Sequence, residues 1–519
     1  MNAEHAPHVD VLIVGAGLSG VGMACHLTRE RPGSSYAIVE ARHDLGGTWD
    51  LFRYPGVRSD SDMYTLGYDF EPWASDVAIA DGADIKAYIE RTAERYDVLR
   101  HVTFGRRVTG ASWDSATSRW TVTTEPSDGD PRGPHPDGSD RAGDPAAGPS
   151  TFTCRWLQMC SGYYSYTSPH RPSFEGEGEF GGRIVHPQEW PRDLSSEAEL
   201  RDRRVVVIGS GATAVTLVPA LADLGATVTM LQRSPTWIVP MPNRNPITIA
   251  LRKVLPERAA YRAIRWINAW RGEKIYETSR TKPEKLKALI HRQVAKALGG
   301  DQLIDPHFTP SYDPWDQRLC LAPDGDIFGA IRAGRAEVVT DRIERFDATG
   351  IALASGRHLD ADVIVTATGL ELLALGGVTP EVDGRPVELA ETFTYKSFMY
   401  SGVPNLGTTF GYINASWTLR ADLVARYVCR LLDELDERGV DRVEPVAEDP
   451  EMTRRPYVDG FPAGYMQRSI HLYPKQSDRD PWTASQSFSH DRDVLLAPDA
   501  ELDDGVLAFG APARVPTPA

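Results

Sequence analysis

Short runs of β-branched and other apolar residues alternate with helical patterns at two places in the chain. The first run, at residues 9–14, leads into a glycine-rich turn, a helical pattern that continues to Glu30 and a second apolar run at 37–40. The same order returns at 204–231, and a further apolar run covers 362–366. Because apolar runs bounded by glycine alternate here with helical periods, the pattern predicts two β-α-β units and a fold of the α/β class.

The segments around these units differ in composition. Residues 240–315, approximately, have a helical pattern rich in Trp, Arg and Lys, which predicts a helical insertion. Residues 125–150 contain mostly Pro, Gly, Asp and Ser. Such a segment cannot bury enough apolar surface to offset its ordering entropy, so we expect a flexible surface insertion. A helical pattern at 418–438 precedes a proline-rich tail.

The first glycine-rich turn has the spacing of a dinucleotide-binding motif, with Gly15, Gly17 and Gly20 at its fixed positions. The first glycine permits a tight turn, the second lets the backbone approach a pyrophosphate, and the third lets helix and strand pack closely. Glu40 follows at the end of the second strand, where a carboxylate can hold a ribose diol. We therefore expect a dinucleotide at this unit.

The second turn differs from the first at the end of its second strand. No acid stands there; Arg233 and Ser234 do. An acid would repel a 2′-phosphate, whereas an arginine beside a hydroxyl would bind one, which favours NADPH over NADH. The alternative is that Arg233 is only a solvated charge at a strand end. The cofactor-binding residues expected in this unit are Gly209, Gly211, Ala212, Thr213, Ala214, Arg233 and Ser234.

Charge and cysteine content narrow the function classes. The formal net charge of −16 over 519 residues argues against non-specific binding to nucleic acid or anionic membranes. The sequence contains neither a membrane-spanning apolar run nor a signal-peptide pattern, so we expect a cytoplasmic protein. No CxxC pair or metal-ligand spacing occurs, which predicts isolated thiols and no metal site and disfavours a flavin disulfide reductase. The cysteines are Cys25, Cys154, Cys160, Cys320 and Cys429.

A longer motif lies just before the second turn. Residues 180–191 read FGGRIVHPQEWP and match FxGxxxHxxxWP at every fixed position. This is the mark of type I Baeyer–Villiger monooxygenases, class B flavoprotein monooxygenases, which the chain therefore resembles. Within that family it is most similar to the ethionamide-activating monooxygenase subgroup. The matching segments are 46–49, 54–73, 209–222, 313–321 and 414–423.

The resemblance implies an FAD-binding domain assembled from both ends of the chain and an NADPH-binding domain between them. We expect two Rossmann-like domains: residues 1–168 and 366–519 for FAD, and 169–365, with the helical insertion, for NADPH. The cofactors implied are thus FAD and NADPH, and nothing in the pattern specifies an oligomeric state. The residues expected at the FAD are Gly15, Gly17, Gly20, Glu40, Gly47, Thr48, Trp49, Asp50, Tyr54 and Asp60.

The resemblance also implies a reaction and its catalytic groups. One oxygen of O₂ would be inserted beside a ketone carbonyl through a flavin C4a-peroxide, giving an ester or lactone, with sulfide oxidation as a side activity. The family's catalytic arginine falls on Arg318 and its partner on Asp60. A fixed guanidinium would stabilise the negative charge on oxygen, and Asp60 would hold it in place. The alternative is a purely structural ion pair.

Other positions carry smaller expectations. We expect His186 to act at the domain connection rather than as a base, Trp190 to pack, and residues 367–369 to form a hinge. Gln317 stands where many relatives have a phosphate-binding lysine, so Arg233 must bear more of the NADPH selectivity. The rival functions are an N- or S-oxygenating flavin monooxygenase and a flavin-binding redox sensor without turnover.

Overall fold

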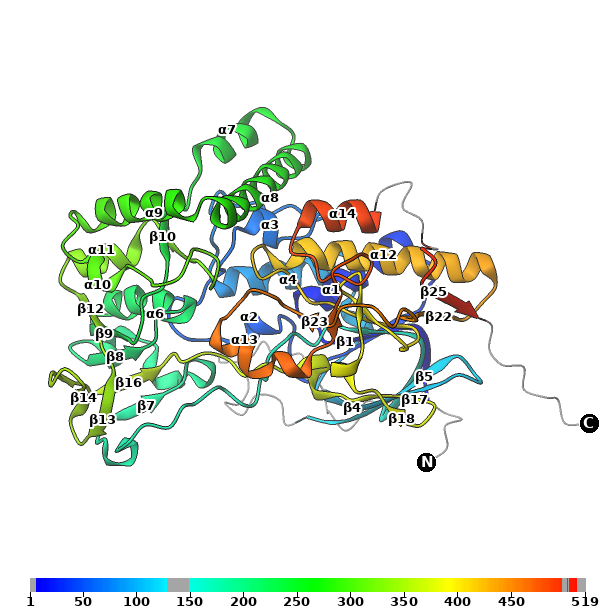
Figure 1. Cartoon of the computed structure of the whole chain (residues 1–519), viewed down its shortest axis with the longest axis horizontal. Coiled ribbons are helices and arrows are strands. Elements are labelled where there is room, and N and C mark those ends of the chain that lie inside the picture. The colour runs from blue at the N-terminus through cyan, green and yellow to red at the C-terminus, as the bar shows by residue number, and fades with distance from the viewer. Residues whose placement is uncertain (1–5, 128–148, 497–501, 503, 511–519) are drawn as a thin grey trace, which may run out of the picture.

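The structure is a computed structural model that describes residues 6–127, 149–496, 502 and 504–510. The predicted flexible insertion at 125–150 lies outside the described residues except at its two ends. Among the described residues, no helix has the length and apolarity needed to cross a membrane. Figure 1 shows two sheet-based halves, with helices packed over and between them.

The first half is built on a mixed sheet with segments from both ends of the chain. Its strands are β1 (His8–Val14), β2 (Tyr36–Val39), β3 (Val102–Thr103), β4 (Arg106–Asp114), β5 (Arg119–Pro126), β6 (Thr151–Met159), β17 (Pro380–Val382), β18 (Arg385–Pro386) and β21 (Leu406–Thr408). The strand order is β18-β17-β4-β5-β6-β1-β2-β3, with β21 also paired to β6. In the parallel centre, Leu12 pairs with Ala37 on one side and Leu157 on the other.

The second half is built on a parallel sheet from the middle of the chain. Its strands are β7 (Arg183–Val185), β8 (Arg204–Ile208), β9 (Thr227–Gln232), β12 (Ala336–Thr340) and β16 (Val363–Thr366). The order is β12-β9-β8-β16-β7. The chain therefore passes from the first sheet to the second between β6 and β7 and returns between β16 and β17. The mixed α/β fold predicted from the strand and helix patterns is confirmed.

Each glycine-rich turn leads into a helix that packs on its own sheet. Helix α1 (Leu18–Glu30) follows β1, and α6 (Ala212–Asp223) follows β8. Both helices bury most of their residues, since their sequences are largely small and apolar. The helix predicted at 418–438 is α12 (Trp417–Arg438), which packs against α1 and carries the C-terminal part of the chain back onto the first half.

The helical insertion bridges the two halves. Its helices are α7 (Pro246–Val254), α8 (Glu257–Thr281), α9 (Pro283–Leu298) and α10 (Ile304–His307). Helix α9 packs on the second half, where Leu286, Ile290 and Val294 enter the core. Helix α8 packs on the first half instead: Tyr261 and Ile264 belong to the core that also contains α1 and α12. The insertion thus ties the outer faces of the halves together.

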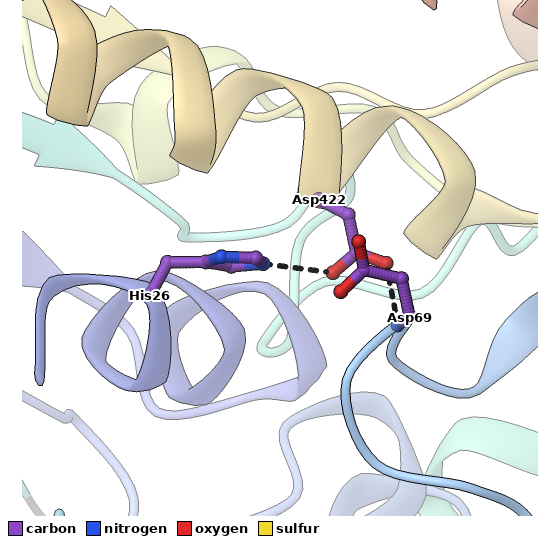
Figure 2. Close-up of side chains that lie close together, drawn as sticks. All are labelled: His26, Asp69 and Asp422. Carbon is purple, nitrogen blue, oxygen red and sulfur yellow. Dashed lines mark hydrogen bonds and ion pairs between the residues drawn. The ribbon is translucent and has the colours of Figure 1, made fainter. Parts of the chain in front are cut away.

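A buried charge network fixes α8 against α1 and α12. Figure 2 shows the imidazole of His26, on α1, directed at the carboxylate of Asp422 on α12, with Asp69 beside them. His26 Nε2 lies 3.2 Å from Asp422 Oδ1, and His26 Nδ1 lies 2.8 Å from Glu30 Oε1. Arg265 of α8 donates to Asp422 Oδ2 at 2.8 Å. The ligand atoms of His26, Asp69 and Asp422 lie close enough together to hold a metal ion, yet the cation already bound to Asp422 is the guanidinium of Arg265.

The network predicts a pH-dependent stability. Burial opposes the charged form of His26, but its bonds to Asp422 and Glu30 prevail and raise its pKa to about 9. The stabilisation by the imidazolium is therefore complete below the ordinary histidine pKa and is lost as the pH rises through about 9. We expect this loss to be about 3 kcal/mol of unfolding free energy. Denaturant unfolding of wild type and His26→Gln across that window measures it. Parallel curves for the two proteins would show that His26 does not titrate there.

Candidate active site

One cavity of about 700 Å³ connects the two glycine-rich turns. Residues after β1 and β2 line one end, residues after β8 and β9 line the other, and residues from the C-terminal part close the side. The carboxyl ends of the parallel strands in both sheets therefore open into the same space, which is where α/β sheets bind ligands.

The first turn is shaped so that a side chain on its glycines would collide with backbone. Gly15 has φ +104°, and a Cβ there would lie 2.6 Å from the carbonyl oxygen of Cys160. At Gly20 a Cβ would lie 1.8 Å from the carbonyl oxygen of Gly15, so this glycine lets α1 approach β1 as predicted. Gly17 lines the cavity directly before the first turn of α1. The helix N-terminus behind it suits a phosphate.

Glu40 lies where the ribose-binding acid is expected. Its side chain lines the cavity and accepts hydrogen bonds from the backbone N–H of Ala16 at 2.6 Å and of Arg42 at 2.7 Å. Burial raises the pKa of this carboxyl, against the effect of those two donors. The two N–H groups fix the carboxyl at the strand end, and each oxygen keeps a second acceptor position for a diol.

The 46–50 motif divides into lining and supporting residues. Gly47, Thr48 and Trp49 line the cavity. Asp50, expected at the cofactor, does not line the cavity. Its carboxylate belongs to a buried ion-pair cluster instead. Arg42 donates from Nε to Asp50 Oδ2 at 2.7 Å, and the ammonium of Lys86 lies 3.1 Å from Asp50 Oδ1. Asp50 therefore orients Arg42, which does line the cavity.

Tyr54 joins the two halves as well as lining the cavity. Its ring packs in the core of the second half, and its hydroxyl interacts with the hydroxyls of Thr213 and Thr216 on α6. Burial raises its pKa to about 12, so it remains a neutral donor. Two residues on, a Cβ at Gly56 would lie 2.6 Å from Cβ of Ala220. The motif thus holds α6 close to the first half.

The second turn repeats the geometry of the first. Gly209 has φ +133°, and a Cβ there would lie 2.4 Å from the carbonyl oxygen of Ala367. Gly211, Ala212 and Thr213 line the cavity, and a Cβ at Gly211 would meet nothing within 4 Å, so this position faces open space. Ala214 is buried and serves packing instead.

Arg233 is placed as a binding residue would be. It is exposed, lines the cavity, and makes no ion pair with any residue that the structure describes. Ser234 is not part of the lining; its carbonyl accepts a bond from Ser210 Oγ at 3.0 Å. Gln317 lines the same cavity. The guanidinium of Arg233 is therefore available to an anionic group.

Arg318 and Asp60 meet in the lining of the cavity. Arg318 Nε lies 2.8 Å from Asp60 Oδ2, and the side chains are 29 % and 40 % exposed. Arg318 stands just before β11 (Cys320–Pro323), which pairs with β10 (Ile238–Met241), so a short sheet of the second half carries it. Burial opposes its charge, but Asp60 raises its pKa above the ordinary arginine value. Arg318 is therefore a permanent cation with N–H groups left over for a ligand.

Several lining residues were not predicted. Tyr163 and Tyr465 line the same cavity as Arg318, whose positive charge acts on both hydroxyl groups. Tyr465 belongs to α13 (Gly464–Ser469), which also brings Arg468 to the cavity wall. The sequence around α13 has no regular spacing of apolar residues and no motif, so nothing in it predicted a binding site there. The position of Arg42 gave a weak indication that it lines the cavity, because it follows the predicted ribose-binding residue Glu40 by two residues.

The FxGxxxHxxxWP residues lie beside the cavity rather than in it. His186 is buried and accepts a bond from the backbone N–H of Gln188 at 3.2 Å. Burial, helped by Arg171, lowers its pKa to about 4, so the imidazole is neutral at pH 7. It interacts with the backbone of Gly369, in the predicted hinge at 367–369. Trp190 is buried and donates to the carbonyl of Leu194 at 3.0 Å, as a packing residue does.

The residues present fit two dinucleotides. Each turn leaves room for backbone to approach a pyrophosphate, one end offers Glu40 to a ribose diol, and the other offers Arg233 to a phosphate. The five cysteines are buried free thiols.

The sequence matches two families and several curated proteins. The family described as an NAD(P)-binding Rossmann-like domain matches residues 13–77, and the one described as flavin-binding monooxygenase-like matches 150–255. The chain is 48 % identical over 512 residues to the FAD-containing monooxygenase EthA of Mycobacterium tuberculosis, covering 98 % of this chain and 99 % of that protein. It is 42 % identical to the probable FAD-binding monooxygenase AlmA of Acinetobacter baylyi, covering 97 % and 96 %.

Solved structures share the fold. An oxidised steroid monooxygenase bound to NADP matches with a TM-score of 0.71 at 23 % identity, covering 97 % of this chain and 100 % of that chain. An open structure of cyclohexanone monooxygenase matches with a TM-score of 0.71 at 19 % identity, covering 98 % and 100 %. At such identities these likenesses show the arrangement of the two halves and carry no statement about substrate.

Proposed function

Because this chain belongs to the family of FAD-containing monooxygenases that includes EthA and AlmA, we propose that it binds FAD and NADPH and carries out Baeyer–Villiger oxidation. One oxygen of O₂ would enter beside a ketone carbonyl to give an ester or lactone, with sulfides as secondary substrates. The observation that carries the proposal is the Arg318–Asp60 pair in the cavity between the two turns. The fixed guanidinium of Arg318 would stabilise the negative charge that develops on oxygen during such a transfer.

The chain's own residues would divide the work of binding. The first turn, Glu40 and Arg42 would hold FAD, and the second turn and Arg233 would hold NADPH. The bound FAD, once reduced by NADPH, supplies the chemistry that activates O₂. Tyr163 and Tyr465 would shape the apolar walls beside Arg318. Their pKa values are raised by burial, so both stay neutral and leave Arg318 as the charged group of that wall.

The positions of His186 and Asp60 support a reaction in which Arg318 stabilises the transferred oxygen, rather than one in which a histidine abstracts a proton. His186 is buried outside the cavity, and its lowered pKa of about 4 reflects its apolar surroundings. Asp60 reaches Arg318 Nε and leaves the guanidinium's other nitrogens to face a substrate. Asp60 is therefore proposed as a positioning residue and Arg318 as the catalytic one.

A panel of ketones and sulfides tests the proposal. Purified protein is expected to be yellow and to release FAD on denaturation, because no recognisable attachment motif is present in the sequence. With NADPH and O₂, ketones should gain one oxygen atom, as measured by product mass. Oxidation of amines or sulfides with no ketone turned over would contradict the Baeyer–Villiger proposal. Bound FAD with no substrate-dependent NADPH oxidation would instead indicate a redox sensor.

A further inference from the structure

The helical insertion has a surface unlike that of the rest of the molecule. Eight of the nine large apolar side chains that are exposed among the described residues lie between residues 247 and 303. Four of them are at least half exposed. These are Ile247 at 58 %, Val254 at 80 %, Trp266 at 60 % and Trp270 at 50 %. Leu472 is the exception elsewhere in the described chain. Single exposed apolar residues are ordinary, but their concentration in one segment indicates a contact surface.

The insertion also reverses the charge of the protein. Residues 244–298 contain 14 Lys and Arg against 4 Asp and Glu, a net charge of +10 in a chain whose net charge is −16. Six of the nine lysines in the sequence fall in this segment. The net negative charge disfavours anionic partners for the molecule as a whole, but this part of the surface is basic. A dipolar protein of this kind would turn its basic end toward an anionic surface.

The basic and aromatic residues are ordered along one stripe of α8. Arg258, Arg262, Trp266, Trp270 and Lys274 are all exposed and follow one another at intervals of four residues. That interval makes each residue the surface neighbour of the next, in a row that winds gradually round the helix. The rings of Trp266 and Trp270 are stacked, with centroids 6.5 Å apart. Arg258 and Arg262 make no ion pair within the described part of the chain.

The turn between α7 and α8 adds aliphatic side chains at the tip. Val254 ends α7 and is 80 % exposed, Leu255 follows it at 36 %, and Figure 1 shows α7 standing beyond the rest of the molecule. We call the α8 stripe, the tip and Ile247 at the start of α7 together the insertion face; it consists of Ile247, Val254, Leu255, Arg258, Arg262, Trp266, Trp270 and Lys274.

We propose that the insertion face docks on the surface of a bilayer that contains anionic lipids. Aliphatic side chains at the tip would enter the boundary of the hydrocarbon, tryptophans would lie at the level of the headgroups, and the arginines and lysines would contact lipid phosphates. The phosphates of a nucleic acid would pair with the basic side chains, but a nucleic acid has no hydrocarbon layer that the side chains of Val254 and Leu255 could enter. A symmetric dimer through this face would bring two basic surfaces together, which costs free energy.

Vesicle sedimentation of the full-length protein tests the proposal. The protein is expected to sediment with vesicles of phosphatidylcholine and phosphatidylglycerol about tenfold more than with phosphatidylcholine alone. High salt should reduce the difference, since exposed charges are screened. Val254→Asp/Leu255→Asp and Trp266→Ser/Trp270→Ser should each lower binding to the mixed vesicles by about tenfold. Leu472→Asp is the matched control, because Leu472 is 48 % exposed outside the insertion, and it should bind as wild type.

Four results would overturn the proposal. One is equal sedimentation with neutral and anionic vesicles, or none with either. Another is wild-type binding by both double variants while their circular dichroism and thermal midpoints remain native. A third is a wild-type dimer in gel filtration that the tip variant converts to a monomer, which would assign the insertion face to a second copy. The fourth is competition by an RNA oligomer that leaves no protein on the vesicles, which would assign the insertion face to nucleic acid.

Discussion

Arg318→Ala is expected to abolish oxygenated product while leaving the protein folded and its FAD bound. Removal of one preorganised donor from the site of developing negative charge costs on the order of 10²–10³ in rate. Reduction of the FAD by NADPH should continue, since the residues proposed to hold both dinucleotides lie at the two ends of the cavity. NADPH consumed without oxygen transfer should appear as hydrogen peroxide. One assay of NADPH, hydrogen peroxide and product measures all three.

The neighbouring variants separate a catalytic arginine from a structural one. Arg318→Lys should recover little, because an ammonium on a different stem cannot copy a planar guanidinium held at 2.8 Å by Asp60. Asp60→Ala should give a milder form of the same uncoupling, since it removes the positioning carboxylate and keeps the donor. Arg280→Ala is the matched control: it breaks a 2.8 Å ion pair with Asp316 outside the cavity lining. A variant at Arg318 that still couples NADPH to product as wild type does would make the pair structural.

Arg233→Ala should raise the Michaelis constant for NADPH and leave that for NADH nearly unchanged. A charge-assisted contact to a 2′-phosphate contributes about 1.5–3 kcal/mol, which corresponds to roughly 10- to 150-fold. We expect the lower part of that range, because Arg233 is exposed and water screens the contact. With Gln317 in place of a second cation, no other predicted contact compensates.

Steady-state kinetics with both nucleotides measures this selectivity. Arg342→Ala is a suitable control, since Arg342 is an exposed arginine of the second half that does not line the cavity. It should leave both Michaelis constants unchanged. Equal increases for NADPH and NADH in Arg233→Ala would mean that Arg233 contacts a part common to the two nucleotides, and the 2′-phosphate assignment would be wrong.

The local parts of the site could be predicted from the sequence. Strand, glycine turn and helix follow one another within about thirty residues in each unit, so spacing alone placed Gly15, Gly17 and Gly211 at the cavity. The Arg318–Asp60 contact came from the family resemblance, not from spacing, because 258 residues separate the two positions. The structure places these side chains in contact but leaves their catalytic role a prediction.

Contacts between distant segments could not be predicted. The helical period of residues 257–281 was evident, but its packing on the first half depends on Arg265 meeting Asp422, 157 residues later. The family resemblance placed Asp50 at the cofactor. The short helix α2 (Thr48–Leu51) instead directs it to Arg42 and Lys86. A sequence pattern gives the neighbours of a residue along the chain, whereas the direction of one side chain depends on which charges the fold brings near it.

The most direct test of the proposed activity is the fate of labelled oxygen in the wild-type enzyme. The purified protein is supplied with NADPH, ¹⁸O₂ and a ketone that it consumes, and the product is analysed by mass spectrometry. The proposal predicts one ¹⁸O atom in the ring or chain position of an ester or lactone, with one NADPH oxidised per product molecule. Product that carries only oxygen from water, or NADPH oxidation that yields hydrogen peroxide and no ester with any ketone tested, would contradict it.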